Sequence, residues 1–158
     1  YIRQFFAGGS NDIRAFRARS LGPGSYNYDI NPDSSQIFPD QGGDIKMMVN
    51  GELRAKLFSV MHGAVFVDAG NVWTAKADAS RMGSQFRLRN ALNEFAVGGG
   101  VGLRVDASIF VIRFDLAMPF RKPWLPAGER WVFNQINFGD PTWRKQNLIL
   151  NIGIGYPF

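Results

Sequence analysis

The chain has 158 residues, which fits one ordinary domain, and its net charge of +5 is modest. It has no cysteine, so disulfides and thiolate metal sites are excluded. It has one histidine, His62, which disfavours a histidine-based catalytic triad. The chain has no run of 18 apolar residues, so no transmembrane helix is predicted. A transmembrane β-strand is not excluded in this way, because it needs only about 9–11 alternating residues. Because Gly (18) and Phe (14) are frequent and helix-forming runs are scarce, composition favours an all-β fold.

The sequence pattern of residues 1–42 predicts the end of a strand followed by a long loop. The chain opens as though already inside a folded element, which we interpret as part of a larger protein. The stretch GGSNDIRAF, residues 8–16, then interrupts the β pattern with two glycines and a lone arginine, Arg14. Residues 29–40 space oxygen-bearing side chains somewhat like a calcium loop, but the central glycine and flanking helices are missing, so we expect no metal site and no cofactor.

Residues 43–158 contain five segments in which apolar and polar residues alternate with a period of two, as in strands with one apolar face. The segments are 44–58, 62–73, 94–106, 108–120 and 146–158. Short links join the first to the second and the third to the fourth, with His62 expected in a turn. Long polar loops make the other connections. This arrangement predicts five antiparallel strands in an up-and-down meander.

Two structures are compatible with this alternation, namely a soluble sandwich or lipocalin-like barrel and an outer-membrane barrel. The segments reach about 11–13 residues, whereas soluble strands average about 5–6. Their polar faces combine glycine and asparagine with isolated charges such as Glu52 and Asp68, which suits a crowded lumen. Aromatic residues near strand ends, Trp73 among them, are typical of interfacial girdles. These features favour the membrane barrel.

Five strands cannot close a barrel, because the smallest single-chain examples have about eight. An open five-stranded sheet in lipid would leave two edges of unpaired backbone groups, each of which costs several kcal/mol. We therefore expect residues 1–158 to be the C-terminal part of one larger transmembrane barrel domain.

Several spaced motifs resemble the BamA/TamA outer-membrane assembly superfamily, which also includes two-partner secretion transporters and organelle import pores. FFAGGSNDIRAF resembles its sixth extracellular loop, whose tip corresponds to Ile13, Arg14, Ala15 and Phe16. The glycines at 42–43 with Glu52, and FVDAGNVW, resemble its twelfth and thirteenth strands. GVGLRVD, IRFDLAMPF and NIGIGYPF resemble the last three. RSLGP at 19–23 further resembles the lipoprotein TamA-like branch of Bacteroidota (TamL).

The resemblance implies a 16-stranded barrel in which the long loop folds back into the lumen and Arg14 meets carboxylates on the inner wall. The face assignment independently points Glu52 and Asp68 inward on adjacent strands. The alternative is a solvated loop arginine. In this sequence Ala15 replaces the glycine of the family's tip, and alanine resists positive φ. Either the turn keeps a negative φ or its geometry differs from that of the family.

The last segment resembles an outer-membrane assembly signal, because it is apolar and ends in an aromatic residue, Phe158, after Tyr156. Gly153 and Gly155 on its other face favour weak pairing at a barrel seam, since glycine adds no packing.

The resemblance implies a non-enzymatic protein of the Gram-negative outer membrane that assembles, inserts or translocates other proteins through a lateral, strand-templating seam. The implied partners are outer-membrane lipids, client outer-membrane proteins, and periplasmic or lipoprotein accessory subunits. Nucleic-acid binding has no supporting fold or aromatic platform in the sequence. A passive outer-membrane channel or transporter and the barrel anchor of a fused enzyme remain alternatives.

Overall fold

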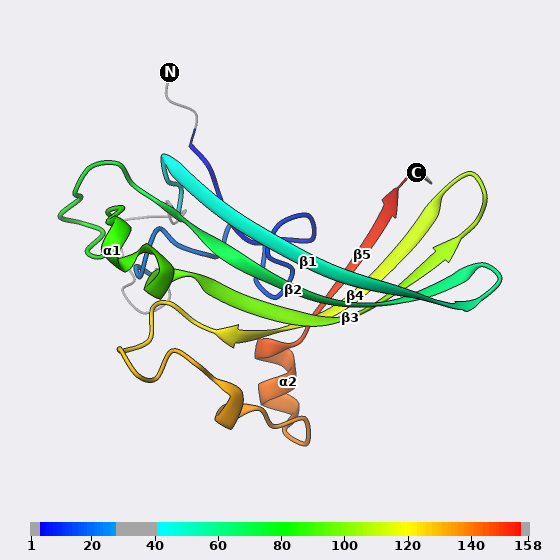
Figure 1. The fold of residues 1–158 in the computed structure, drawn as a ribbon. Coiled ribbons are helices and arrows are strands. Elements are labelled where there is room, and N and C mark those ends of the chain that lie inside the picture. The colour runs from blue at the N-terminus through cyan, green and yellow to red at the C-terminus, as the bar shows by residue number, and fades with distance from the viewer. Residues whose placement is uncertain (1–3, 28–40, 156–158) are drawn as a thin grey trace.

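A computed structural model describes residues 4–27 and 41–155. It contains one antiparallel sheet with the strand order β1-β2-β3-β4-β5. The strands are β1 (Ile45–Phe58), β2 (Met61–Trp73), β3 (Ala96–Asp106), β4 (Val111–Arg121) and β5 (Ile149–Gly155). Each strand therefore pairs with its sequence neighbour, and the predicted up-and-down meander is confirmed (Figure 1).

Short and long connections lie at opposite ends of the sheet, because consecutive strands run antiparallel. At one end, Met61 follows Phe58 after two residues, and residues 107–110 join β3 to β4 with Ser108 at a φ of 68°. His62 is the second residue of β2 and pairs with Lys56, so its predicted place in a turn is wrong. We name this end of the sheet the short-turn end.

The two long connections at the other end contain short helices that the strand pattern did not predict. The first holds α1 (Leu88–Ala91) and the 3-10 helix η1 (Leu92–Glu94), and the second holds the 3-10 helix η2 (Phe133–Gln135) and α2 (Pro141–Asn147). Asp140 caps α2 by accepting a hydrogen bond from the Thr142 backbone amide at 2.8 Å. No helix of the described residues is long and apolar enough to span a membrane.

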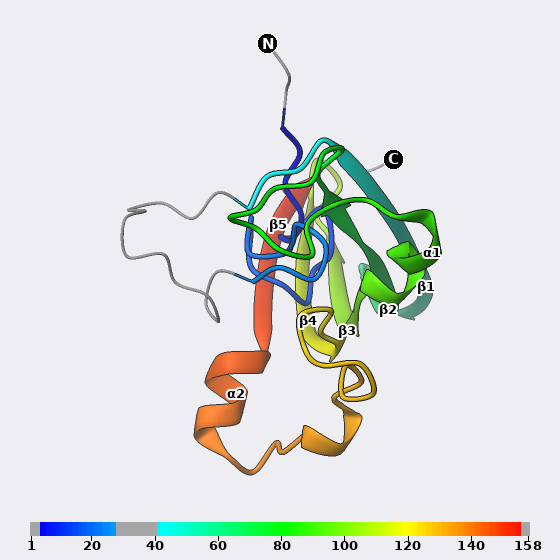
Figure 2. The ribbon, with the colours of Figure 1, turned by 90° about the vertical axis from the view of Figure 1, so that its left-hand side faces the viewer.

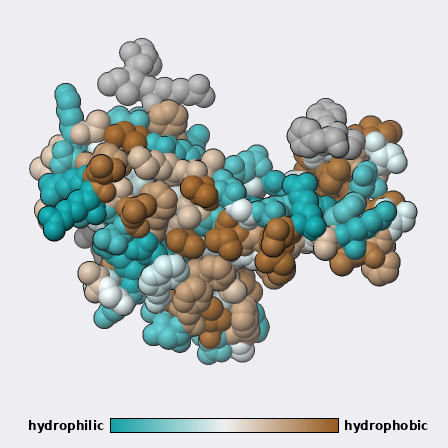
Figure 3. All heavy atoms as spheres, in the orientation of Figure 1, coloured by the Kyte–Doolittle hydropathy of each residue, from teal (hydrophilic) through white to brown (hydrophobic). Residues whose placement is uncertain are grey.

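The burial of the sheet is inverted relative to a soluble protein. Its apolar face is exposed, as at Leu53 (81%), Ile154 (77%) and Val101 (56%), whereas Asp68 and Asp115 on the polar face are fully buried. Hydrophobic side chains accordingly form a band across the exposed surface in Figure 3. This is the pattern of a strand whose apolar side faces lipid and whose polar side faces a lumen.

Residues 4–27 form a folded segment that we call the inner loop, and it covers the polar face. Figure 2 shows it inside the curve of the sheet, between β5 on one side and β1 on the other. Its apolar side chains join the inner faces of the strands in one small core. The buried members are Ala7, Ile13, Ala15, Phe16, Leu21, Phe66, Val72, Ala96 and Ala117.

The expected interfacial position of Trp73 is wrong. Its side chain is fully buried, between Phe86 and Phe95 at ring-centroid distances of 5.6 and 5.8 Å. Its indole Nε1 donates to Glu94 Oε2 at 2.6 Å. Because a buried indole N–H needs an acceptor, Trp73 anchors the loop after β2 instead of lying at the lipid surface.

Candidate functional site

Arg14, at the tip of the inner loop, lies against the carboxylates of two neighbouring strands. Its Nε and Nη2 donate to the two oxygens of Asp68, both at 2.8 Å, and its Nη1 donates to Glu52 Oε2 at 2.6 Å. The side chain of Arg14 is 7% exposed and that of Asp68 is fully buried. A bidentate, charge-assisted pair of this kind fixes the direction of the guanidinium plane as well as its position.

Arg14 also makes a cation–π contact, because its guanidinium carbon lies 3.5 Å from the centroid of the Phe66 ring. Phe66 and Asp68 are two residues apart on β2 and therefore share a face. The strand thus offers one aromatic surface and one carboxylate to the same cation. A desolvated cation–π contact adds about 2 kcal/mol.

A second arginine connects this pair to the next strands. Arg104 on β3 donates through Nη1 to Asp115 Oδ1 on β4 at 2.5 Å and through Nη2 to both oxygens of Glu52, at 3.1 Å each. Arg14 Nη1 lies 3.6 Å from Asp115 Oδ2, and Arg54 Nε donates to Glu52 Oε1 at 2.7 Å. The ion pairs therefore form one network across β1 to β4.

The packing of the tip depends on close approach between the inner loop and β3. A methyl group added at Gly98 would lie 2.1 Å from Ala15 Cβ, and one added at Gly102 would lie 2.4 Å from Asp115 Oδ1. These glycines on the polar face therefore make room for the loop tip and for the charged network. Arg19 and Ser108 are the non-glycine residues with positive φ in the described ranges, so the turn at Ala15 keeps a negative φ.

Further polar contacts attach the tip to the outer strands. Asn151 Nδ2 on β5 donates to the Arg14 carbonyl at 3.0 Å, and Asn50 Nδ2 on β1 donates to the Asp12 carbonyl at 2.8 Å. Arg113 Nη2 on β4 donates to the Ser10 carbonyl at 2.8 Å. With the contact at Gly98, the inner loop touches all five strands.

The structure thus brings Arg14, Glu52 and Asp68 together. Sequence reasoning missed Phe66, Asn50, Asn151 and Asp115 as neighbours of the tip. The alternation already placed Phe66 on the same face as Asp68, which was the one signal available for it.

The other predicted residues do not take part in the charged network. Ile13 and Phe16 are buried in the small core, and the Phe16 ring meets Trp124 edge-on at 6.0 Å. Gly153 and Gly155 lie on β5. Tyr156, Phe158 and the whole calcium-like stretch, residues 29–40, lie outside the described residues. Within the described ranges, no three His, Cys, Asp or Glu side chains gather as metal ligands.

Taken together, a meander with an exposed apolar face and a loop bonded to its charged inner face defines a section of a membrane β-barrel with a loop-filled lumen. The chain belongs to the Omp85 superfamily, whose domain model matches residues 2–152. In Gram-negative bacteria, members of this superfamily are outer-membrane proteins. In general they assemble or translocate proteins without enzymatic activity and work with client outer-membrane proteins and accessory subunits. The resemblance found in the sequence is therefore confirmed at superfamily level, and the TamA-like lipoprotein branch stays a prediction.

Proposed function

We propose that this protein inserts or translocates other proteins at the outer membrane, without catalysis, by pairing client strands with the edge of β5. Residues 43–158 would supply the last five strands of the barrel domain, and residues 1–42 the end of a strand and the lumenal loop. The partners would be outer-membrane lipids, client barrel proteins and periplasmic or lipoprotein subunits. Arg14, Glu52 and Asp68 would hold the loop so that the lumen wall keeps its shape.

The observation that carries this proposal is the edge of β5. The described part of β5 covers Ile149–Gly155 and contains two glycines, Gly153 and Gly155. It pairs with β4 on one side, and no strand of the described residues pairs with its other side. Unpaired N–H and C=O groups on an edge are a template for an added strand. Gly153 and Gly155 leave that backbone accessible.

The test uses the full-length protein in proteoliposomes, with Gly155→Cys as the reporting variant. A side chain added at Gly155 meets no other atom within 4 Å. Residues 1–158 contain no cysteine, and any cysteine elsewhere in the full-length protein is first replaced by serine, so that the new thiol is unique. A denatured barrel client with one cysteine in its C-terminal strand is added. With copper phenanthroline added as the oxidant, we expect the two thiols to form a disulfide between the proteins during insertion, and Val101→Cys, exposed on the central strand β3, is the control.

The outcomes separate the candidate functions. Insertion with cross-linking at Gly155 and not at Val101 supports strand templating. Insertion without cross-linking at Gly155 contradicts the templating mechanism. Steady conductance without insertion favours the passive channel, and hydrolytic activity of the full-length protein favours the enzyme anchor.

A further inference from the structure

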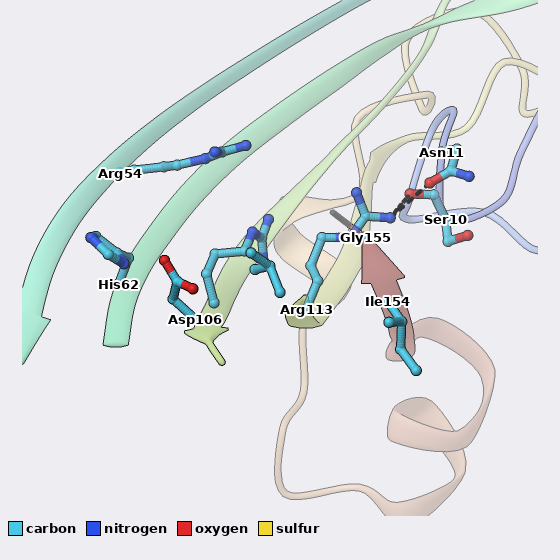
Figure 4. A pocket seen from close by; sticks show the side chains of 11 residues that line it. Ser10, Asn11, Arg54, His62, Asp106, Arg113, Ile154 and Gly155 are labelled. Atoms are coloured by element: carbon cyan, nitrogen blue, oxygen red, sulfur yellow. Dashed lines mark hydrogen bonds between the residues drawn. The ribbon is translucent and has the colours of Figure 1, made fainter. Parts of the chain in front are cut away.

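A cavity of about 520 Å³ lies on the polar face, between the inner loop and the short-turn end of the sheet. Its lining includes the charged residues Arg54, Arg104, Arg113 and Asp106, together with His62. Figure 4 shows Arg54, His62 and Arg113 coming from different strands around the same hollow, while Ile154 points away from it. We call this cavity the basic pocket.

The location of the basic pocket follows from strand register. His62 is the second residue of β2, Asp106 is the last residue of β3, and Gly155 is the last residue of β5. All three therefore lie at the short-turn end. In outer-membrane barrels the short turns face the periplasm, so the pocket opens toward the periplasmic mouth.

The charges that line the pocket differ from those behind it. Four guanidinium groups, those of Arg14, Arg54, Arg104 and Arg113, pair with three carboxylates. Glu52 and Asp115 each pair with three of these arginines. These three carboxylates are not among the residues that line the pocket, whose own charged groups are three arginines and Asp106. The surface that the pocket presents is therefore mainly cationic.

The arginines of this wall differ in exposure. Arg104 has a side chain 6% exposed, and its Nε is buried without an acceptor among the described residues, so an incoming group does not reach it. Arg54, by contrast, is 64% exposed and has room to turn toward an incoming group. Arg54 is therefore the guanidinium group that the pocket offers to a further anion.

We infer that the basic pocket binds carboxylates of an acidic polypeptide segment that enters the lumen from the periplasmic side. A polypeptide fits because the pocket is also lined by Gly155, where an added side chain would meet no atom within 4 Å and the backbone of β5 is open to close approach. Arginines supply bidentate partners for carboxylates, and the β5 edge supplies main-chain donors and acceptors. The inference rests on the proposed function, because it names the chemistry of a partner or client segment.

The test measures binding of a fluorescent octaglutamate peptide to the full-length protein in detergent micelles, by fluorescence anisotropy. Arg54→Glu is the reporting variant, because this side chain is exposed and its loss does not open the core. Lys76→Glu, in the exposed loop after β2, carries the same charge change and is the control. We expect at least tenfold weaker binding for Arg54→Glu, unchanged binding for Lys76→Glu, and no binding of an octaglutamine peptide.

Equal loss in both variants would show attraction to net charge and would overturn the inference, as would complete displacement of the peptide by inorganic phosphate at equal concentration. A second readout does not depend on any variant. A benzophenone-bearing peptide should cross-link to residues 10–11 or 111–113, and cross-linking confined to the exposed apolar face would overturn the assignment. Absent peptide binding with intact client insertion overturns the pocket alone, whereas absent insertion by the wild type overturns the proposed function.

Discussion

At the scale of single residues, Arg14 bonds the inner loop to the sheet through Asp68 and Glu52. Its removal leaves Asp68 fully buried without its bidentate partner and Glu52 without one of its cations. Breaking a buried pair in this way costs about 3–5 kcal/mol, because a charge stays behind in a poorly solvated site. The loop gains conformational entropy when it detaches, so the lost free energy of binding the loop leads first to local detachment of the loop from the sheet.

We therefore expect Arg14→Ala to increase the rate at which a non-specific protease cleaves the inner loop in the folded full-length protein. An effect of about 3 kcal/mol corresponds to roughly 10²-fold in the opening equilibrium. Arg14→Lys keeps the charge and loses the planar fork, so its rate should be intermediate. Arg17→Ala, at an exposed position of the same loop, is the control, and equal rates for Arg14→Ala and Arg17→Ala would refute the role of Arg14.

A second prediction at this scale concerns the contact between Gly98 and Ala15. In Gly98→Ala the added methyl would lie 2.1 Å from Ala15 Cβ, so the loop tip must move away from β3. We expect faster proteolysis of the inner loop in this variant. Adding Ala15→Gly removes the clashing methyl and should restore most of the protection. If the double variant is as sensitive as Gly98→Ala alone, the contact between these two residues is not what limits packing of the tip.

At the scale of elements, Trp73 and Glu94 join the end of β2 to the start of β3 through the long loop between them. Glu94 lies outside the strands, and burial raises the pKa of its carboxyl above the ordinary value of 4.5, although the Trp73 hydrogen bond and nearby arginines oppose that rise. Folding therefore favours the protonated form. Its contribution to stability is complete below the ordinary pKa and is lost as the pH rises through the raised pKa.

Glu94→Gln keeps an oxygen acceptor for the Trp73 indole and carries no charge. We expect this variant to be more heat-stable than the wild type at pH 8, with the difference disappearing as the pH falls toward 4. Thermal denaturation of the full-length barrel across this pH range measures the effect. A difference that is constant with pH would show that titration of Glu94 does not contribute, and Asp140→Asn provides a control carboxylate outside the strands.

Some elements and contacts were predictable from the sequence alone, and others were not. The five strands were predictable because a period of two persists over each of them. The helices in the loops were not, since four to seven residues are too few to establish a period of 3.6, although Asp140 followed by Pro141 was a usable start signal for α2. The contact between Asn151 and Arg14 joins residues 137 positions apart, and no local pattern encodes it. Glu52 and Asp68 were found because face assignment and the family resemblance pointed to the same residues.

At the scale of the whole molecule, the protein is organised with its apolar side outward. Each large apolar side chain removed from water stabilises the fold by about 1.5–3 kcal/mol, so the exposed face of the sheet gains this free energy only in lipid. The inner face is held instead by the ion network and by the small core under the inner loop. The loop thus acts as the lumenal packing partner of the strands.

This organisation predicts the effect of a charge on the outer face. Val101 lies at the centre of β3 and is 56% exposed. Val101→Arg should lower the free energy of unfolding in lipid vesicles by about 2–4 kcal/mol, the cost of arginine near the bilayer midplane. Val101→Leu should change it little, and urea titration in vesicles measures both. An arginine tolerated at this position would mean that water covers the face.

The most direct test of the lipid-facing sheet is a spin-label scan of β1 in the full-length protein in bilayers. Each residue from 49 to 57 is replaced in turn by a labelled cysteine; residues 1–158 contain none, and any cysteine elsewhere in the full-length protein is first replaced by serine. We predict that labels at Val49, Leu53 and Leu57 collide with dissolved oxygen, and that labels at Asn50 and Lys56 collide less with oxygen and more with a water-soluble nickel complex. Uniform access of the nickel complex along β1, or the opposite alternation, would contradict the account.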